Sequence, residues 1–192
     1  SDTHTYSVDT DATLGSVTDN GDGTFTYDPN GAFEALAQGE ITSDSFVYTV
    51  DDGNGGTSSE TVTILLTGEN DAPTVSGDLL STLTEDDDAI LINLIENASD
   101  VDNNAVLSVS EVVQTGGRPA QFFAGVGTPD LGFNPSNFQD LDDGESEDVV
   151  FTYDVLDENG ASVPTTLTVT VTGVNDAPEA TSLSFTTNED EV

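Results

Sequence analysis

Residues 46–73 read FVYTVDDGNGGTSSETVTILLTGENDAP, and residues 151–178 read FTYDVLDENGASVPTTLTVTVTGVNDAP. The two stretches align without a gap, and fourteen of the twenty-eight positions are identical. In both, apolar and polar residues alternate on either side of a turn rich in Asp, Asn and Gly, which predicts short strands joined by a turn. Asp71 and Asp176 mark the same place in the two copies, 105 residues apart. A repeat of that length is typical of tandem domains.

The rest of the chain carries the same kind of signal. Further short runs rich in Thr, Val, Ile, Tyr and Phe lie at 24–27 and 89–94, and turn signals such as DNGDG at 19–23 separate them. Evenly spaced short strands with such turns predict an all-β fold of tandem antiparallel β-sandwich modules. We expect helix only briefly, around residues 31–36 or 137–141.

The charge balance narrows the function. The chain has 38 acidic residues, one Arg and one His, and its net charge is −37. Such a chain repels itself unless cations neutralise it, and Arg118 alone cannot form the basic patch that nucleic acid requires. Without Cys or Lys no nucleophile–base pair is expected, so we predict no enzyme, although paired carboxylates can hydrolyse glycosides. No apolar run approaches the roughly 20 residues that span a bilayer, so we expect no membrane insertion.

The two Asn-Asp-Ala-Pro tetrapeptides mark the expected domain boundaries, because proline fixes φ and removes a donor from a strand ladder. We expect a first module at 1–71 that lacks its opening strand or strands, a complete module at 72–176, and the opening strand of a following module at 177–192. The sequence reads as an excerpt from a longer chain. One hypothesis is that residues 180–187 supply the missing strand to a neighbouring molecule by β-strand addition. The alternative is that these residues are a chain end with no such role.

Acidic loops near these tetrapeptides are candidate metal sites. Calcium takes roughly six to eight oxygen ligands from carboxylates, amides and carbonyls. Asp100 and Asp102 lie two residues apart on one face of an extended segment, and clustered carboxylates repel each other without a cation. The predicted Ca²⁺ ligands are Asn70, Asp71, Glu85, Asp86, Asp100 and Asp102, followed by Asp176 and Glu189 at the second joint.

Each acidic loop also has a purely structural interpretation, since Asp and Asn beside Gly or Pro commonly form turns. Residues 19–23 begin like an EF-hand loop but lack its later ligands, so a hairpin turn is favoured there. The same holds for residues 51–55, although Asp52 and its repeat Asp157 could reach a joint.

Taken together, the runs DTHTYSV at 2–8, GSVTDNGDGTFTYDPNGAFEALAQGE at 15–40 and DSFVYTVDDGNGGTSSETVTILLTGENDAPT at 44–74 resemble the VCBS repeat. The second module, with its TEDDDA…ASDVDNN opening, is similar to the bacterial cadherin-like repeat. Both kinds of repeat occur in arrays within secreted RTX-type adhesins and biofilm proteins of Gram-negative bacteria. The resemblance implies immunoglobulin- or cadherin-like sandwiches, calcium at the joints, neighbouring repeat modules as partners, and a place at the bacterial cell surface.

Two functions are expected from these features. The first is a calcium-stiffened extender module of a large surface adhesin, where cations at the joints convert a flexible acidic chain into a rod. The second is a calcium-dependent module that recognises carbohydrate or a like module on another cell. The chain has no Trp and only four Tyr, which disfavours a sugar site. Residues 113–132 fit the repeat pattern poorly and carry Phe122 and Phe123, so a ligand site is expected there if anywhere.

Overall fold

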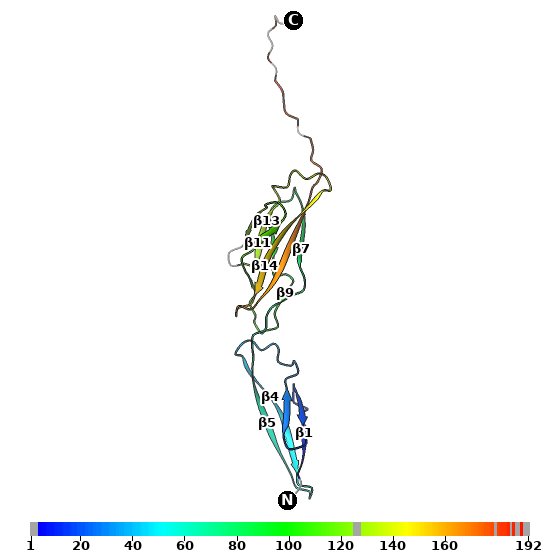
Figure 1. The fold of residues 1–192 in the computed structure, drawn as a ribbon, viewed down its shortest axis with the longest axis vertical. Coiled ribbons are helices and arrows are strands. Elements are labelled where there is room, and N and C mark those ends of the chain that lie inside the picture. The colour runs from blue at the N-terminus through cyan, green and yellow to red at the C-terminus, as the bar shows by residue number, and fades with distance from the viewer. Residues whose placement is uncertain (1–3, 125–127, 179, 185, 187–188, 190–192) are drawn as a thin grey trace.

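A computed structural model of the chain describes residues 4–124, 128–178, 180–184, 186 and 189. All regular secondary structure in these residues is β-strand, as the sequence predicts. The strands are β1 Thr5–Asp9, β2 Ser16–Asp19, β3 Phe25–Asp28, β4 Ile41–Asp51, β5 Thr57–Thr67, β6 Thr74–Val75, β7 Leu79–Thr84, β8 Ile90–Asn93, β9 Ala98–Ser99, β10 Ser108–Val109, β11 Val113–Gly116, β12 Gln121–Ala124, β13 Asp130–Asn134, β14 Ser146–Leu156 and β15 Ser162–Thr172 (Figure 1).

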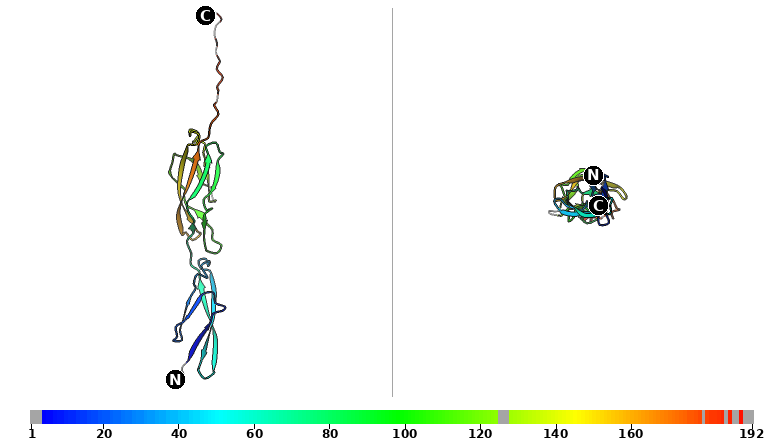
Figure 2. Two further views of the ribbon diagram at one scale, coloured as in Figure 1. Left: turned by 90° about the vertical axis from the view of Figure 1, so that its right-hand side faces the viewer. Right: turned by 90° about the horizontal axis from the view of Figure 1, so that it is seen from below.

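Two modules lie end to end and give the chain the shape of a rod (Figure 1, Figure 2). The N-terminal module contains β1–β5, and the C-terminal module contains β6–β15. Residues 68–73 connect them, and residues 173–178, which follow β15, leave from the far end of the C-terminal module. No helix in the described part of the chain is long and apolar enough to cross a membrane.

The repeated stretches form the same hairpin in both modules. β4 and β5 are antiparallel in a register that sets Ile41 opposite Thr67, and β14 and β15 set Ser146 opposite Thr172. Each strand of the second hairpin begins and ends 105 residues after its counterpart in the first. The alignment of the two halves is therefore confirmed residue by residue.

The C-terminal module is a filled sandwich. One sheet has the order β10-β14-β15-β7, with β11 also pairing with β14, and β7 runs parallel to β15. The other sheet has the order β12-β13-β8. Burial of apolar surface is the main favourable term in folding. The buried core comprises Leu79, Leu83, Ile92, Leu94, Val112, Leu131, Phe133, Phe138, Leu141, Val149, Phe151, Tyr153, Val155, Leu167, Val169 and Val171.

The N-terminal module has fewer strands and a thinner core. β1, β4 and β5 form one sheet, and β2 and β3 form a hairpin. Phe25 of β3 packs edge-on against Phe46 and lies beside Tyr48, both on β4, so these aromatic rings join the two layers. Phe46 is buried, whereas Tyr48 is half-buried.

A buried carboxylate organises the N-terminal module. Asp44 accepts hydrogen bonds from the backbone N–H groups of Leu14, Gly15 and Ser45 and from the hydroxyl of Tyr27. Burial acts to raise the pKa of Asp44, but these hydrogen bonds outweigh it and hold that pKa below the ordinary value. Burial, followed by the contact with Asp44, raises the pKa of Tyr27 to about 12. Asp44 is therefore a structural anion that fixes the approach to β2.

The two short helices expected at 31–36 and 137–141 are wrong. Both segments form turns instead, in which Leu36 N–H donates to Phe33 O and Leu141 N–H donates to Phe138 O. Helix nucleation is costly, and segments this short cannot offset it by propagation. The DNGDG segment at 19–23 does form the predicted hairpin turn, between β2 and β3.

Candidate functional site

The joint between the modules is a network of side-chain contacts. Pro73 at its end is fully buried. Asn70 Nδ2 donates to Asp157 Oδ2 at 2.8 Å, and Asn159 Nδ2 donates to Asn70 Oδ1 at 2.6 Å. Asp157 and Asn159 belong to the turn between β14 and β15. The linker that leaves the N-terminal module is therefore held by a turn of the C-terminal module.

Asp157 is an enclosed carboxylate, with 5% of its surface exposed. Its Oδ1 accepts the N–H groups of Asn159 and Ala161 at 2.8 and 2.9 Å, which closes the turn and leaves Oδ2 for Asn70. Burial acts to raise the pKa of Asp157, but the hydrogen bonds from Asn70 and from the turn outweigh it and hold that pKa below the ordinary value. An ionised carboxylate therefore lies at the joint. The sequence had indicated that Asp157, the repeat of Asp52, could reach a joint.

The acidic loop after β9 makes a second contact with the linker. Asp71 N–H donates to Asp102 Oδ2 at 3.1 Å, and Asp102 N–H donates to Asp100 Oδ1 at 3.0 Å. Asp102 is buried and Asp100 is half-buried. Four of the predicted ligands, Asn70, Asp71, Asp100 and Asp102, therefore come together at one joint.

Two carboxylate oxygens of this loop have no hydrogen-bond partner in the described residues. They are Asp100 Oδ2 and Asp102 Oδ1, and both are buried. A buried, uncompensated negative charge is strongly destabilising. The chain has little positive charge to compensate it. Its one Arg, Arg118, forms ion pairs with Asp140 and Glu147, and its one His, His4, interacts electrostatically with Asp52 in the N-terminal module.

Asn103 ties the same loop to the N-terminal module. Its N–H donates to Ala35 O at 2.9 Å, and its Nδ2 donates to Glu40 Oε2 at 2.9 Å. Neither Glu40 nor Asn159 was among the predicted site residues. The repeat held a signal for Glu40, since its counterpart Glu145 occupies the same place before the second joint.

The carboxylate and amide oxygens at the joint are donors that suit a hard divalent cation, although they do not converge on one point. Among the residues that the structure describes, no group of three or more acidic or histidine side chains could hold a metal ion as it stands. Several of the oxygens already accept amide or backbone hydrogens. The types of donor nevertheless fit calcium, and the orphaned oxygens of Asp100 and Asp102 are the feature that a cation would satisfy.

Glu85 and Asp86 lie at the other end of the C-terminal module. β7 carries the chain away from the joint, and its six residues span about 20 Å at roughly 3.3 Å per residue. Glu85 is 1% exposed; its Oε1 accepts the N–H of Val174 at 2.9 Å, and its Oε2 is buried without a described partner. Asp86 is exposed. Proximity in sequence grouped these acids with Asp71, but the direction of β7 places them beside the second joint.

The remaining predicted ligands, Asp176 and Glu189, are exposed. Asn175 Nδ2 donates to Asp176 O at 3.3 Å, just as Asn70 Nδ2 donates to Asp71 O at 2.8 Å. The hydrogen bond from the linker asparagine to the next carbonyl is therefore repeated at the second joint.

Arg118 lies in the segment 113–132, whose described residues form β11, β12 and the first part of β13. Its guanidinium pairs with Asp140 and, at 2.6 Å, with Glu147, and it lies 4.9 Å from the ring centre of Phe138. The hydrogen bonds that Arg118 donates to Asp140 and Glu147 raise the pKa of its guanidinium. The described residues of this segment therefore belong to the sandwich.

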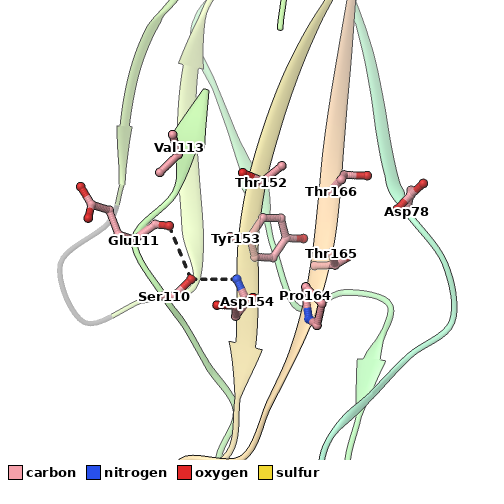
Figure 3. Close-up of a pocket in the computed structure, with 10 residues that line it drawn as sticks. All are labelled: Asp78, Ser110, Glu111, Val113, Thr152, Tyr153, Asp154, Pro164, Thr165 and Thr166. Carbon is pink, nitrogen blue, oxygen red and sulfur yellow. Dashed lines mark hydrogen bonds between the residues drawn. The ribbon is translucent and has the colours of Figure 1, made fainter. Parts of the chain in front are cut away.

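A shallow depression of about 430 Å³ lies over β14 and β15 (Figure 3). Asp78, Glu111 and Asp154 are among its lining residues, and Ser110 Oγ accepts the N–H of Asp154 at 2.7 Å. Tyr153 also lines it, with its hydroxyl donating to Leu94 O at 2.8 Å. None of the lining residues is basic, so the depression does not suit an anionic ligand.

The adjacent phenylalanines of β12 differ in their surroundings. The ring of Phe122 packs edge-on against Phe151 with centroids 4.9 Å apart. Phe123 is 58% exposed, and the tip of its ring lies against Gly132, where a Cβ would overlap it. Phe123 is therefore an exposed aromatic side chain within the segment 113–132, where a ligand site was expected.

Residues 70–172, more than half of the chain, match the bacterial Ig domain. The chain belongs to the bacterial Ig domain family. Residues 1–68, where the sequence resembles the VCBS repeat, match the bacterial cadherin-like domain, whereas the second module, expected to be cadherin-like, matches the bacterial Ig domain. The chain thus holds a cadherin-like domain and an Ig domain in tandem, two kinds typical of bacterial surface and adhesion proteins, and neither is a catalytic family. The search of curated proteins found no match.

Solved structures of cadherins share the fold. Drosophila N-cadherin EC1-4 is 16% identical with a TM-score of 0.52, and the match covers 92% of this chain and 44% of that one. Human mucin-like protocadherin EC1-2 is 13% identical with a TM-score of 0.51, over 88% of this chain and 84% of that one. The chain spans less than half of the N-cadherin fragment. At these identities the likeness shows the fold alone.

Proposed function

We propose that the cadherin-like and Ig domains form a calcium-stiffened extender segment of a large bacterial surface adhesin of the VCBS or RTX type, which acts in cell adhesion or biofilm formation. The observation that carries the proposal is the pair of buried, unpaired oxygens of Asp100 and Asp102 beside the linker. Such oxygens in a chain with a net charge of −37 call for a cation, and the neighbouring donors are of the kind that calcium prefers.

The residues that would hold the ion are Asp100 and Asp102, with Asn70, Asp71 and Asp157 next to them. A bound calcium ion supplies two positive charges at a place where the protein supplies none. The chain's own residues define which surfaces meet, because Asn70 contacts the Asp157 turn directly. The cation would strengthen an arrangement that these contacts already specify.

A second set is proposed at the far end of the Ig domain. Glu85 Oε1 accepts the N–H of Val174, and its Oε2 is buried without a partner in the described residues. Asp86 follows Glu85 in sequence, and Asp176 and Glu189 follow Val174. This arrangement supports a cation between the Ig domain and a following module, so neighbouring repeat modules are the proposed partners.

The test is thermal unfolding with calcium and with magnesium at matched ionic strength. A ligand that binds only the folded joint stabilises it by about 2.7 kcal/mol at a hundredfold excess over Kd. The double change Asp100→Asn and Asp102→Asn should remove most of the calcium-induced rise in Tm. The control is Asp19→Asn with Asp22→Asn, which alters the net charge equally in an exposed hairpin turn. Equal effects of the two double changes would overturn the assignment.

One observation favours a second function, the calcium-dependent recognition of carbohydrate. The exposed ring of Phe123 is the kind of apolar surface on which a sugar ring can pack. Glycan-array binding that is lost in Phe123→Ala would support this function, and binding that survives the change would exclude Phe123 from it.

A further inference from the structure

Four Asn-Gly pairs lie between strands of the chain, and one of them lies at the joint between the two domains. The pairs are Asn20-Gly21, Asn30-Gly31, Asn54-Gly55 and Asn159-Gly160. Because glycine has no side chain, its backbone nitrogen approaches the side chain of the preceding asparagine with little steric hindrance. An exposed Asn-Gly pair is therefore the sequence at which an asparagine side chain most readily loses its amide group.

The pair at the joint belongs to the tight turn between β14 and β15. Gly160 has a φ of 90°, in the left-handed region that glycine adopts without strain, so the turn itself requires glycine after Asn159. Both residues are exposed. Water therefore reaches the two groups that a deamidation joins, the side chain of Asn159 and the backbone nitrogen of Gly160.

The side-chain amide of Asn159 also closes the joint. Its Nδ2 donates to Asn70 Oδ1 at 2.6 Å. Asn70 has no hydrogen left to offer in return, because the two on its own Nδ2 go to Asp71 O and Asp157 Oδ2, both at 2.8 Å. Turning the Asn70 amide over would place its oxygen against the carboxylate of Asp157. Asn70 therefore meets Asn159 as an acceptor only.

We propose that Asn159 is a site of spontaneous deamidation and that the reaction permanently loosens the joint. The backbone nitrogen of Gly160 attacks Cγ of Asn159 and forms a new C–N bond. The bond from Cγ to Nδ2 breaks, and the side-chain nitrogen leaves as ammonia with the proton from the Gly160 N–H. Water then adds to either carbonyl carbon of the succinimide ring and opens it to aspartate or isoaspartate. One water is consumed and one ammonia is released, so no oxidant or reductant is needed.

Both products weaken the contact with the linker. A carboxylate at position 159 has only acceptor oxygens, and the group that it faces, Asn70 Oδ1, is an acceptor as well. Its charge is added to the turn that already holds the carboxylate of Asp157, and like charges at short range repel. Isoaspartate also inserts a methylene into the backbone, which disturbs the N–H groups of residues 159 and 161 that Asp157 Oδ1 accepts.

The closed joint protects the reacting group. While Nδ2 is bonded to Asn70, the side chain of Asn159 is held toward the linker and has less freedom to approach the nitrogen of Gly160. Deamidation should therefore proceed mainly when the joint is open. Each reaction makes later opening more frequent, so a joint that opens often becomes permanently looser.

The repeat provides an internal reference for the rate. Asn54-Gly55 lies 105 residues earlier in a turn of the same geometry, where Asp52 Oδ1 accepts the N–H groups of Asn54 and Gly56 at 2.8 and 2.9 Å. In the described residues, the side-chain amide of Asn54 donates only to Asp52 O within its own turn. The two pairs therefore compare the same chemistry with and without a contact across the joint.

The first test is peptide mapping by mass spectrometry of the full chain, aged for weeks in EDTA at mildly alkaline pH. EDTA keeps the result separate from the proposed calcium sites. In the wild type, Asn159 should deamidate measurably but severalfold more slowly than Asn54. Asn70→Ala removes the acceptor and should bring the rate at Asn159 close to that at Asn54. The control Asn175→Ala, the same change outside this joint, should leave the ratio of the two rates unchanged.

The second test measures the consequence. Asn159→Asp reproduces one product and should make hydrogen exchange in EDTA about tenfold faster at the amides of Asp71 and Asn103, through the loss of one hydrogen bond and the added charge. Asn54→Asp adds the same charge in the matching turn and should leave both amides unchanged. Aged wild-type protein should show the faster exchange in its deamidated fraction.

Three results would each overturn the proposal. The first is an Asn159 side chain that stays intact in the aged wild type, and the second is a deamidation rate at Asn159 that does not respond to Asn70→Ala. The third is unchanged exchange at the joint in both Asn159→Asp and the deamidated wild type.

Discussion

Removing the side chain of Asn70 tests whether the joint is held by the protein itself. Asn70→Ala deletes the hydrogen bond to the charged Asp157 at 2.8 Å and the bond from Asn159 at 2.6 Å. A hydrogen bond to a charged group contributes about 1.5–3 kcal/mol and a neutral one about 1 kcal/mol. Water can reach part of the joint, so the free energy of joint opening should fall by about 2 kcal/mol.

Hydrogen exchange in EDTA measures this opening through two amides that bridge the domains. Asp71 N–H donates to Asp102, and Asn103 N–H donates to Ala35. A loss of 2 kcal/mol corresponds to exchange that is about thirtyfold faster at both amides. The matched control is Asn175→Ala, the same change 105 residues later, where among the described residues the side-chain amide donates only to the carbonyl of Asp176. Unchanged exchange in Asn70→Ala, or an equal effect of Asn175→Ala, would refute the reasoning.

Three further predictions concern the two domains. Gly68→Ala should destabilise the cadherin-like domain by about 2 kcal/mol, because a Cβ would overlap the carbonyl oxygen of Leu36; urea unfolding checks it, and a neutral change would contradict it. Phe151→Ala should cost the Ig domain about 3–5 kcal/mol in the same assay, and a loss below 1 kcal/mol would show that the core is not packed as described. The folded pKa of Asp44 lies below its unfolded value of about 3.9, so the stability it contributes is complete above that pH and is lost as pH falls through the folded pKa. Tyr27→Phe should therefore lower Tm at neutral pH, with the difference from the wild type narrowing in acid; a difference that widens in acid would contradict the sign.

The repeat made the hairpins predictable and left their partners undetermined. Alternation of apolar residues fixed the register of β4 with β5 and of β14 with β15, because a slip of one residue would turn the core face outward. The same alternation does not say which strand lies beside β15. The parallel pairing of β7 was therefore missed, and with it the position of Glu85.

The candidate site was predictable where ligands were close in sequence. Asp100 and Asp102 share one short loop, and Asn70 and Asp71 share the linker, so their residue types could be recognised directly. The contacts of Asn159 and Glu40 depend on how two folded domains meet, at sequence separations that no local pattern encodes. The offset of 105 residues was the one long-range signal in the sequence.

The claim that calcium stiffens the joint is tested most directly by small-angle scattering of dilute protein, in calcium and in magnesium at matched ionic strength. The account predicts a longer and less flexible particle in calcium only, with no such change in the Asp100→Asn, Asp102→Asn double variant. The same dimensions and flexibility in both ions, or a calcium response that survives the double change, would contradict it.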